Sequence, residues 1–239
     1  MSIRLGVIMD PIGSINYKKD STLAMLLAAQ KKGWTLFYME QADIYLAEGE
    51  ARSLMRPLQV RADANDWFTL GNAIPTPLSD LDVILMRKDP PFDMDYIYTT
   101  YLLELAETAG VFVVNKPQSL RDANEKLYTA WFPQCTPPTL VTSQAELIRA
   151  FLDKHADIIL KPLDTMGGAS IFRVQQNDLN TGVIIETLTR HGKRQIMAQR
   201  FIPEIRDGDR RTVLFTDGLF VDQRVLGVAT EPCGGANGR

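Results

Sequence analysis

The first half of the chain alternates short apolar runs with longer mixed stretches, a pattern typical of alternating strands and helices. Four of these runs have the character of strands buried on both faces of a parallel sheet: Leu5–Met9, Trp34–Met39, Asp82–Met86 and Val111–Val114. Asp20 or Ser21 can cap a helix over Thr22–Lys32, and a second helix is predicted over Tyr96–Ala109. This order predicts an α/β fold whose first domain is a Rossmann-like parallel sheet with right-handed connections.

The second half has a different pattern, which predicts an antiparallel sheet covered by helices. The predicted elements are a helix over Ser119–Trp131, a proline-rich linker over Pro133–Thr139, helices over Gln144–Lys154 and Gly182–His191, and a strand over Gln195–Phe201. The sequence therefore predicts two domains, residues 1–122 and residues 123–239, the second built of α+β elements.

A glycine-rich hairpin is the most informative feature of this second half. Apolar residues in Ile158–Leu160 and Ala169–Val174 flank a turn that contains Gly167 and Gly168, and Lys161 follows the first run. Glycines let backbone N–H groups approach an anion, and the lysine adds a positive charge. Taken alone, an ordinary hairpin with a surface lysine is the favoured interpretation.

Polar residues also follow three of the four apolar runs in the first half. They are Asp10, the cluster Arg87-Lys88-Asp89 and the pair Asn115-Lys116. Strands commonly end in polar loops, but ligands of open α/β sheets bind beyond the carboxyl ends of the strands. Three such ends, one of them with two adjacent cations, favour a binding site.

Composition excludes several classes of function. The chain has 239 residues, a net charge of −3, two cysteines and two histidines. This gives no reason to expect a nucleic-acid partner, a disulfide framework or a metal quartet. The sequence shows neither a signal peptide nor an apolar run long enough to cross a membrane, so a cytoplasmic protein is expected. A dinucleotide-binding domain is disfavoured, because Asp-Pro-Ile-Gly-Ser follows the first strand in place of a glycine fingerprint.

Several weak signals after the linker can form one nucleotide pocket. Lys126 and Lys161 are suited to phosphate oxygens, and the turn with Gly167 and Gly168 would close over them. The segment Met197–Ile202 alternates apolar and polar residues and could offer backbone groups to an adenine edge. Asp209-Arg210-Arg211 could place a cation on the terminal phosphate.

In this order and spacing the elements resemble those of the ATP-grasp ligases, and within that superfamily the chain resembles the bacterial glutathione synthetases. The likeness covers about residues 3–217, and its most specific segment is Met86-Arg-Lys-Asp-Pro-Pro-Phe-Asp93. Other matching segments are Val7–Ile12, Val114–Asp122, Asn124–Lys126 and Ile159–Val174.

The resemblance implies an ATP-dependent carbon–nitrogen ligase that joins γ-glutamylcysteine to glycine through an acyl phosphate, with Mg²⁺ or Mn²⁺, in a cytoplasmic homo-oligomer that is a tetramer in the family. Arg211 and Lys161 would be catalytic, and Arg87, Asp89 and Asn115 would bind substrate. ATP would be bound by Lys126, Lys161, Met166, Gly167, Gly168, Gln199, Phe201, Ile202, Asp209 and Arg211. Thr165, where the family often has glycine, is expected to make closure of the turn slower or less complete.

The last part of the chain departs from the family pattern after about residue 218. The resemblance implies that the acidic residue and the Glu-x-Asn pair that hold magnesium would lie in a missing C-terminal part, so no metal ligand is assigned in this chain. A frameshift, a fragment and a naturally short homologue are the alternatives. A non-catalytic or impaired nucleotide-binding module, and an ATP-grasp ligase with another acceptor, remain open as functions.

Overall fold

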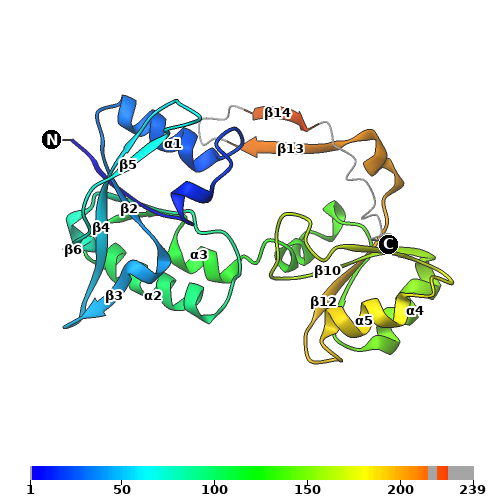
Figure 1. Cartoon of the computed structure of the whole chain (residues 1–239). Coiled ribbons are helices and arrows are strands. Elements are labelled where there is room, and N and C mark those ends of the chain that lie inside the picture. Colours follow the sequence, from blue (N-terminus) through cyan, green and yellow to red (C-terminus); the bar gives the residue numbers. More distant parts are fainter. Residues whose placement is uncertain (1, 215–219, 226–239) are drawn as a thin grey trace, which may run out of the picture. The chain divides into compact units, whose positions relative to one another are not determined.

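The computed structural model describes residues 2–214 and 220–225, and for residues 209–214 and 220–225 it describes the backbone. The chain divides into two compact units (Figure 1). One unit consists of Met1–Trp131 with Pro162–Ile171, and the other consists of Phe132–Lys161 with Phe172–Arg239.

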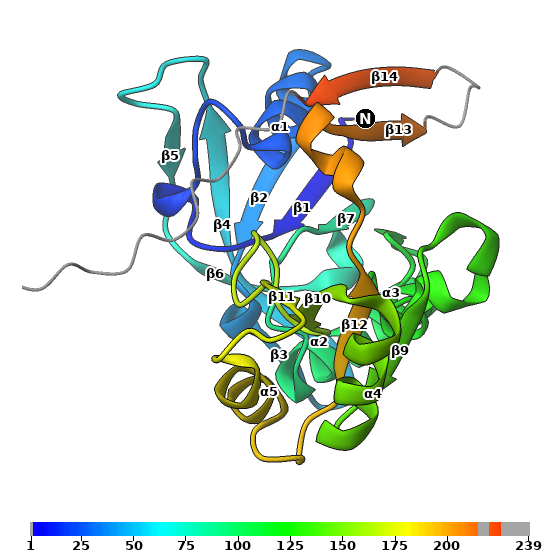
Figure 2. The ribbon, with the colours of Figure 1, turned by 90° about the vertical axis from the view of Figure 1, so that its right-hand side faces the viewer.

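A mixed sheet forms the centre of the first unit, in the strand order β3-β4-β2-β1-β7-β8, and β5 and β6 also pair with β4 (Figures 1 and 2). The strands are β1 (Arg4–Ile8), β2 (Thr35–Met39), β3 (Ile44–Ala47), β4 (Glu50–Val60), β5 (Phe68–Leu70), β6 (Ile74–Pro77), β7 (Val83–Met86) and β8 (Phe112–Val114). Neighbouring strands in β2-β1-β7-β8 are parallel, as predicted. The α/β class is therefore confirmed.

Strands β3, β4, β5 and β6 add to the four predicted parallel strands. β3 and β6 both run antiparallel to β4. β3 contains no fully buried residue, and β6 contains two prolines and is exposed or half-buried throughout. Prolines are tolerated at the edge of a sheet, where a missing N–H breaks no ladder. β6 lacks the apolar run that marks a buried strand, and the short apolar run of β3 lies at the edge of the sheet, where it is exposed or half-buried.

Helices α1 (Ser21–Lys31) and α2 (Met94–Thr108) pack on opposite faces of the parallel strands. Asp20 caps α1, as predicted, because its Oδ1 accepts a hydrogen bond of 2.7 Å from the backbone N–H of Leu23. Asp93 caps α2 in the same way, with a bond of 3.0 Å from the N–H of Tyr96. These side chains satisfy backbone donors that a helix leaves open at its start.

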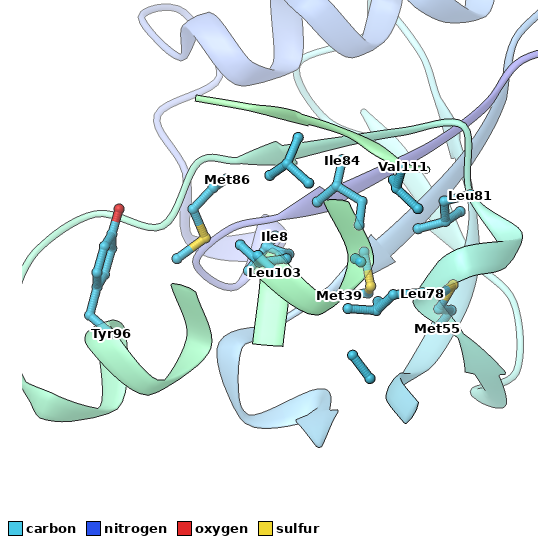
Figure 3. Packing of buried hydrophobic residues seen from close by; sticks show 13 residues of the cluster. Ile8, Met39, Met55, Leu78, Leu81, Ile84, Met86, Tyr96, Leu103 and Val111 are labelled. Atoms are coloured by element: carbon cyan, nitrogen blue, oxygen red, sulfur yellow. The ribbon is translucent and has the colours of Figure 1, made fainter. Parts of the chain in front are cut away.

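The two faces of the sheet carry separate hydrophobic clusters, because successive side chains of a strand point in opposite directions. On one face, Ile8, Met39 and Ile84 pack with Leu103 of α2 (Figure 3). On the other face the cluster consists of Leu5, Val7, Leu36 and Tyr38 from the strands with Leu23 and Leu26 from α1. Gly6 lies between these layers, and a Cβ added there would lie 2.5 Å from Leu81 and 2.7 Å from Met39. Close packing therefore requires glycine at this position.

The second unit contains a four-stranded sheet in the order β11-β10-β12-β9. Its strands are β9 (Thr139–Thr142), β10 (Asp157–Pro162), β11 (Phe172–Gln175) and β12 (Ile196–Arg200), and its helices are α4 (Ala145–His155) and α5 (Thr181–Thr189). The predicted hairpin is confirmed, since β10 and β11 are antiparallel with Leu160 opposite Phe172. Ile148 of α4 and Ile185 of α5 pack on Ile158 of β10 in one cluster.

The backbone of β13 (Asp209–Leu214) pairs antiparallel with β14 (Phe220–Val225). Short 3-10 helices occupy Ile12–Ser14, Gln41–Asp43, Leu78–Asp80, Leu127–Trp131, Pro133–Cys135 and Pro203–Asp207.

One local prediction was wrong. The predicted single helix over Ser119–Trp131 is instead α3 (Pro117–Asp122), a loop and a 3-10 helix over Leu127–Trp131. Asn124 breaks it, because its Oδ1 accepts hydrogen bonds from the backbone N–H groups of Lys126 (3.1 Å) and Leu127 (2.9 Å). In β12 three consecutive residues from Ile196 are buried. That strand is central in its sheet and covered by both helices.

Candidate functional site

The ends of β1 and β7 in the first unit carry a cluster of charged side chains. Lys88 Nζ lies 2.8 Å from Asp10 Oδ1, and the other carboxylate oxygen of Asp10 accepts a hydrogen bond of 2.9 Å from the backbone N–H of Asp89. Lys88 Nζ also donates to the carbonyl of Asp89 at 2.7 Å. The lysine side chain is only 17% exposed. Asp10 therefore ties together the segments that follow two neighbouring parallel strands.

The carboxyl group of Asp89 has a raised pKa. Loss of solvent around the carboxyl raises it most, although the residue as a whole is exposed, and the nearby charge of Asp10 raises it further. Arg87 and Lys88 act in the opposite direction. Two carboxylates and two cations thus share a small volume, and the protonation of Asp89 depends on its neighbours.

Arg87 is the cation of this cluster that remains on the surface. Its Nε donates to Thr22 Oγ1 at 3.1 Å, and its Nη2 donates to Ser21 Oγ at 3.0 Å. Both acceptors lie in the first turn of α1. Among the residues whose side chains the structure describes, none forms an ion pair with Arg87, whereas Lys88 is paired with Asp10.

A cavity of about 500 Å³ adjoins this cluster within the first unit. Its walls are formed by Lys88, Pro90, Phe92, Tyr96, Asn115, Lys116, Ser119, Leu120, Ala123, Asn124, Glu125, Leu163 and Asp164. The lining combines aromatic rings with cations and amides, as small-molecule pockets do. The predicted substrate residue Asn115 therefore lines a cavity, and the hairpin loop contributes Leu163 and Asp164 to the same wall.

The loop after α3 and the hairpin loop are joined by polar contacts. Asn124 Nδ2 donates to the carbonyl of Leu163 at 3.3 Å. Lys126 Nζ donates to the carbonyl of Thr165 and, at 2.5 Å, to Glu125 Oε1. The lysine side chain is 14% exposed. Lys126 thus touches the hairpin loop directly.

The glycines of the hairpin loop have a backbone conformation that other residues rarely adopt. Gly167 has a φ of 67° and Gly168 a φ of 79°, and a Cβ at either position would meet nothing within 4 Å. The requirement for glycine is therefore conformational and not one of space. The turn is closed by a hydrogen bond of 3.3 Å from the N–H of Ala169 to the carbonyl of Met166. Met166, like both glycines, is exposed.

Four of the residues predicted to bind the nucleotide lie in the second unit and have side chains that the structure describes. Lys161 lies in β10, next to the hairpin loop in sequence. Gln199 Nε2 donates to Thr139 Oγ1 at 2.9 Å. The N–H of Phe201 donates to the carbonyl of Asp157 at 3.0 Å, and Ile202 is 45% exposed.

Arg173 is a residue that the sequence did not single out. Its guanidinium carbon lies 3.8 Å from the centre of the Phe201 ring, and its Nη2 lies 2.6 Å from Asp157 Oδ2. The hydrogen bonds from Arg173 lower the pKa of Asp157. Asp157 lies in β10, Arg173 lies in β11 and Phe201 follows β12, so no local sequence pattern marks this group.

Asp209 and Arg211 are placed by their backbone. They lie in β13, opposite Val225 and Gln223 of β14. Their side chains lie outside the part of the chain whose side chains the structure describes.

A further contact network holds the segment after β1 in place. The N–H of Ile12 donates to the Tyr38 hydroxyl at 3.3 Å, and its carbonyl accepts a bond of 3.0 Å from the Trp67 indole. The pKa of the Tyr38 hydroxyl is raised, first by burial and then by its hydrogen bond to Glu40. Asp10 lies two residues before Ile12, so the buried Tyr38 and the half-buried Trp67 support the charged cluster.

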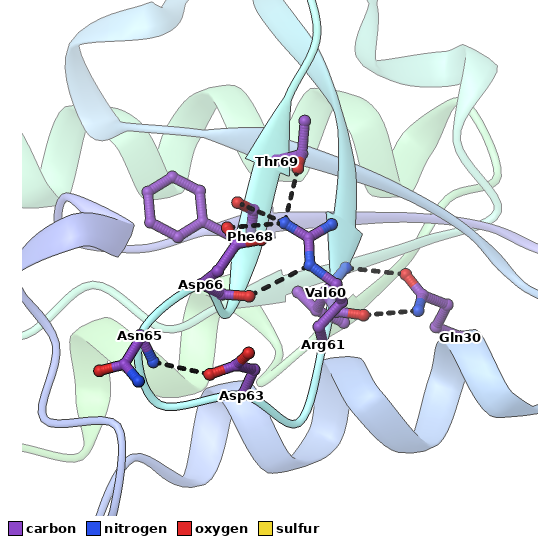
Figure 4. A network of polar contacts seen from close by, with 8 residues as sticks. All are labelled: Gln30, Val60, Arg61, Asp63, Asn65, Asp66, Phe68 and Thr69. Carbon is purple, nitrogen blue, oxygen red and sulfur yellow. Dashed lines mark hydrogen bonds and ion pairs between the residues drawn. The ribbon is translucent and has the colours of Figure 1, made fainter.

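The loop that carries Trp67 is itself fixed by polar contacts (Figure 4). Arg61 Nη2 donates to Asp66 Oδ1 at 2.8 Å and to Thr69 Oγ1 at 2.8 Å. Gln30 of α1 bonds both backbone groups of Val60, at 2.7 and 2.9 Å. No local sequence pattern indicates this network, which joins residues of α1, β4 and β5.

No group of three or more His, Cys, Asp or Glu side chains suited to a metal ion occurs among the residues that the structure describes. No helix in the described part of the chain is long and apolar enough to cross a membrane.

Most of the chain matches known protein families. The prokaryotic glutathione synthetase N-terminal domain matches residues 3–121, and the prokaryotic glutathione synthetase ATP-grasp domain matches residues 125–232. The chain belongs to the prokaryotic glutathione synthetase family. The expected resemblance is thus confirmed, and use of ATP follows from the ATP-grasp domain.

Relatives of known name agree with this family. The glutathione synthetase of Pseudomonas syringae pv. tomato is 65% identical over 218 residues, which are 91% of this chain and 68% of the relative. That of Pseudomonas putida is 64% identical over 222 residues, 93% of this chain and 70% of the relative. Among solved structures, a D-cycloserine synthetase superposes with a TM-score of 0.61 at 15% identity, over 91% of this chain and 65% of that one. At that identity the likeness concerns the fold.

Proposed function

We propose that this glutathione synthetase family member joins γ-glutamylcysteine to glycine at the expense of ATP. The observation that carries the proposal is the cavity beside Arg87 and Lys88, in a chain whose two family domains cover residues 3–121 and 125–232. In this proposal residues 1–122 form the substrate domain and residues 123–239 the ATP-grasp domain. A cytoplasmic homo-oligomer is the expected state.

The charged cluster supports a carboxylate-binding role for Arg87. A guanidinium presents donors in a planar fork that fits a carboxylate with two hydrogen bonds. Two of its donors are occupied by Ser21 and Thr22, which leaves donors on the outer side for a ligand. Asn115 offers a neutral amide in the same region, and Asp89 can accept a hydrogen bond from a substrate ammonium group when it is ionised.

The nucleotide side of the proposal rests on the lysines and the glycine turn. Lys126 now donates to Thr165 and Glu125, so it must exchange these partners for phosphate oxygens when ATP binds. Lys161 supplies a second positive charge. Backbone N–H groups of Gly167 and Gly168 can approach the phosphates without obstruction from a Cβ, and Met166 precedes them in the same exposed turn.

The remaining nucleotide residues would bind the base and the terminal phosphate. Gln199 lies near the end of β12, Phe201 and Ile202 follow that strand, and these three residues would contact the adenine. Asp209 and Arg211 lie on β13, and Arg211 would neutralise charge on the transferred phosphoryl group.

The reaction that these groups would support has two steps. A substrate carboxylate oxygen attacks the γ-phosphorus of ATP, the bond to ADP breaks, and an acyl phosphate forms. The amine of glycine then attacks the acyl carbon, phosphate leaves and the amine loses a proton. Both steps depend on alignment and on neutralising phosphoryl charge. Mg²⁺ or Mn²⁺ would be the metal cofactor, and the lysines, Arg211 and the backbone donors of the turn would neutralise phosphoryl charge beside it.

Incubation of the purified chain with ATP, Mg²⁺, γ-glutamylcysteine and glycine tests the proposal. ADP release that requires both substrates, with formation of glutathione, supports it. Turnover with another acceptor would identify a different ATP-grasp ligase. Nucleotide binding without turnover would identify a binding module, and either result would refute the proposed activity.

A further inference from the structure

The contacts of Arg87 with the first turn of α1 are unusual for a surface arginine. Arg87 comes directly after β7, and its backbone N–H continues the pairing with β1 by donating to Ile8 at 2.7 Å. From there its side chain reaches Ser21 and Thr22, which are 66 and 65 residues away in the sequence. Only the parallel pairing of β1 and β7 brings these residues close together.

Thr22 is buried although it is polar. It is 4% exposed, and its hydroxyl accepts the hydrogen bond from Arg87 Nε. A buried hydroxyl needs a partner, and loss of that partner is costly. Ser21 is exposed and binds the Nη2 end of the same guanidinium. The two hydroxyls therefore hold one edge of the planar group at two points, which fixes its orientation.

Arg87 directly precedes Lys88, which lines the cavity. The charge of Arg87 lowers the pKa of Asp89 and of Tyr96, against the effect of burial on both groups. Tyr96 lines the cavity. Lys88, the neighbouring cation, is neutralised by Asp10 at 2.8 Å. Among the described residues, no carboxylate lies within ion-pair distance of Arg87. Arg87 thus provides the positive charge of this cluster that lacks a carboxylate partner.

We propose that the hydroxyls of Ser21 and Thr22 are positioning residues that orient the Arg87 guanidinium for a carboxylate of the dipeptide substrate, and so determine the affinity for γ-glutamylcysteine. This inference rests on the proposed function. An arginine side chain has many rotamers, and ordering such a side chain on binding lowers affinity. Holding it in place before binding removes that cost.

Thr22→Val tests the inference because valine has the shape of threonine without the hydroxyl. We expect its dissociation constant for γ-glutamylcysteine, measured by titration calorimetry, to rise about three- to tenfold, whereas affinity for an ATP analogue stays within about twofold. Thr22→Ser keeps the hydroxyl and should restore the affinity. Ser21→Ala, at an exposed position, should weaken dipeptide binding in the same direction without affecting folding. In turnover assays the KM for the dipeptide should rise and kcat should change little.

Arg87→Lys distinguishes failure of the proposed function from failure of the positioning role alone. If the unaltered chain does not bind γ-glutamylcysteine, the proposed function fails. If the unaltered chain binds it and Arg87→Lys weakens binding, but Thr22→Val and Ser21→Ala do not, the positioning role alone is overturned. In the Arg87→Lys background, Thr22→Val should have no further effect on dipeptide affinity. An additive effect there would also overturn the inference.

Discussion

Replacement of Asn124 by alanine should release the loop that carries Lys126. The Asn124 side chain makes three hydrogen bonds, with Oδ1 accepting from the N–H groups of Lys126 and Leu127 and Nδ2 donating to the carbonyl of Leu163. Loss of a side-chain cap of this kind costs about 1 kcal/mol. The bond to Leu163 is long, at 3.3 Å, and contributes ~0.5 kcal/mol. The expected loss in unfolding free energy is therefore ~1.5 kcal/mol.

The matched control is Asn124→Asp, which keeps the acceptor for both N–H groups and loses the donor to Leu163. Its loss should be about 0.5 kcal/mol. Urea denaturation measures the stability of both variants, and fluorescence titration with an ATP analogue measures the placement of Lys126. Affinity should fall about three- to tenfold in Asn124→Ala and less in Asn124→Asp. Equal losses in the two variants would refute the capping role, because the bond to Leu163 would then dominate.

Three further outcomes are expected. The low pKa of Asp157 means that its pairing with Arg173 stabilises the fold above pH ~4, and that this contribution disappears as the pH falls through the pKa of the folded state. The loss in stability of Asp157→Asn should thus be ~0.5 kcal/mol near neutral pH and vanish in acid; a loss independent of pH in denaturation experiments would contradict this. Gly168→Ala should destabilise the hairpin turn by ~1 kcal/mol, because alanine must adopt a φ of 79°, and should weaken binding of the ATP analogue; unchanged affinity would argue against a phosphate-binding turn. Thr165→Gly removes the hydrogen bond of 3.3 Å from Oγ1 to the carbonyl of Ala169 and should increase hydrogen exchange over residues 165–170; equal protection and equal nucleotide affinity would refute a role for Thr165 in closure.

Elements whose formation depends on neighbouring residues could be predicted from the sequence alone. Apolar runs such as Leu5–Met9 predict the parallel strands because a strand buried on both faces needs apolar residues at every position. Asp20 marks the start of α1 because a cap acts on N–H groups within one turn. The hairpin around Gly167 and Gly168 is likewise a local pattern. The family assignment depends on such contiguous segments, and it was therefore also available from the sequence.

Features that depend on contacts between residues far apart in the chain became visible only in the tertiary structure. The predicted helix over Ser119–Trp131 is interrupted at Asn124, whose side chain also bonds a carbonyl 39 residues later. Arg87 is oriented by Ser21 and Thr22 because β1 and β7 are neighbours in the sheet. Local periodicity encodes which side chains are buried, but it contains no information on which strands become neighbours. The partners of a polar group at the end of a strand are settled only when the sheet forms.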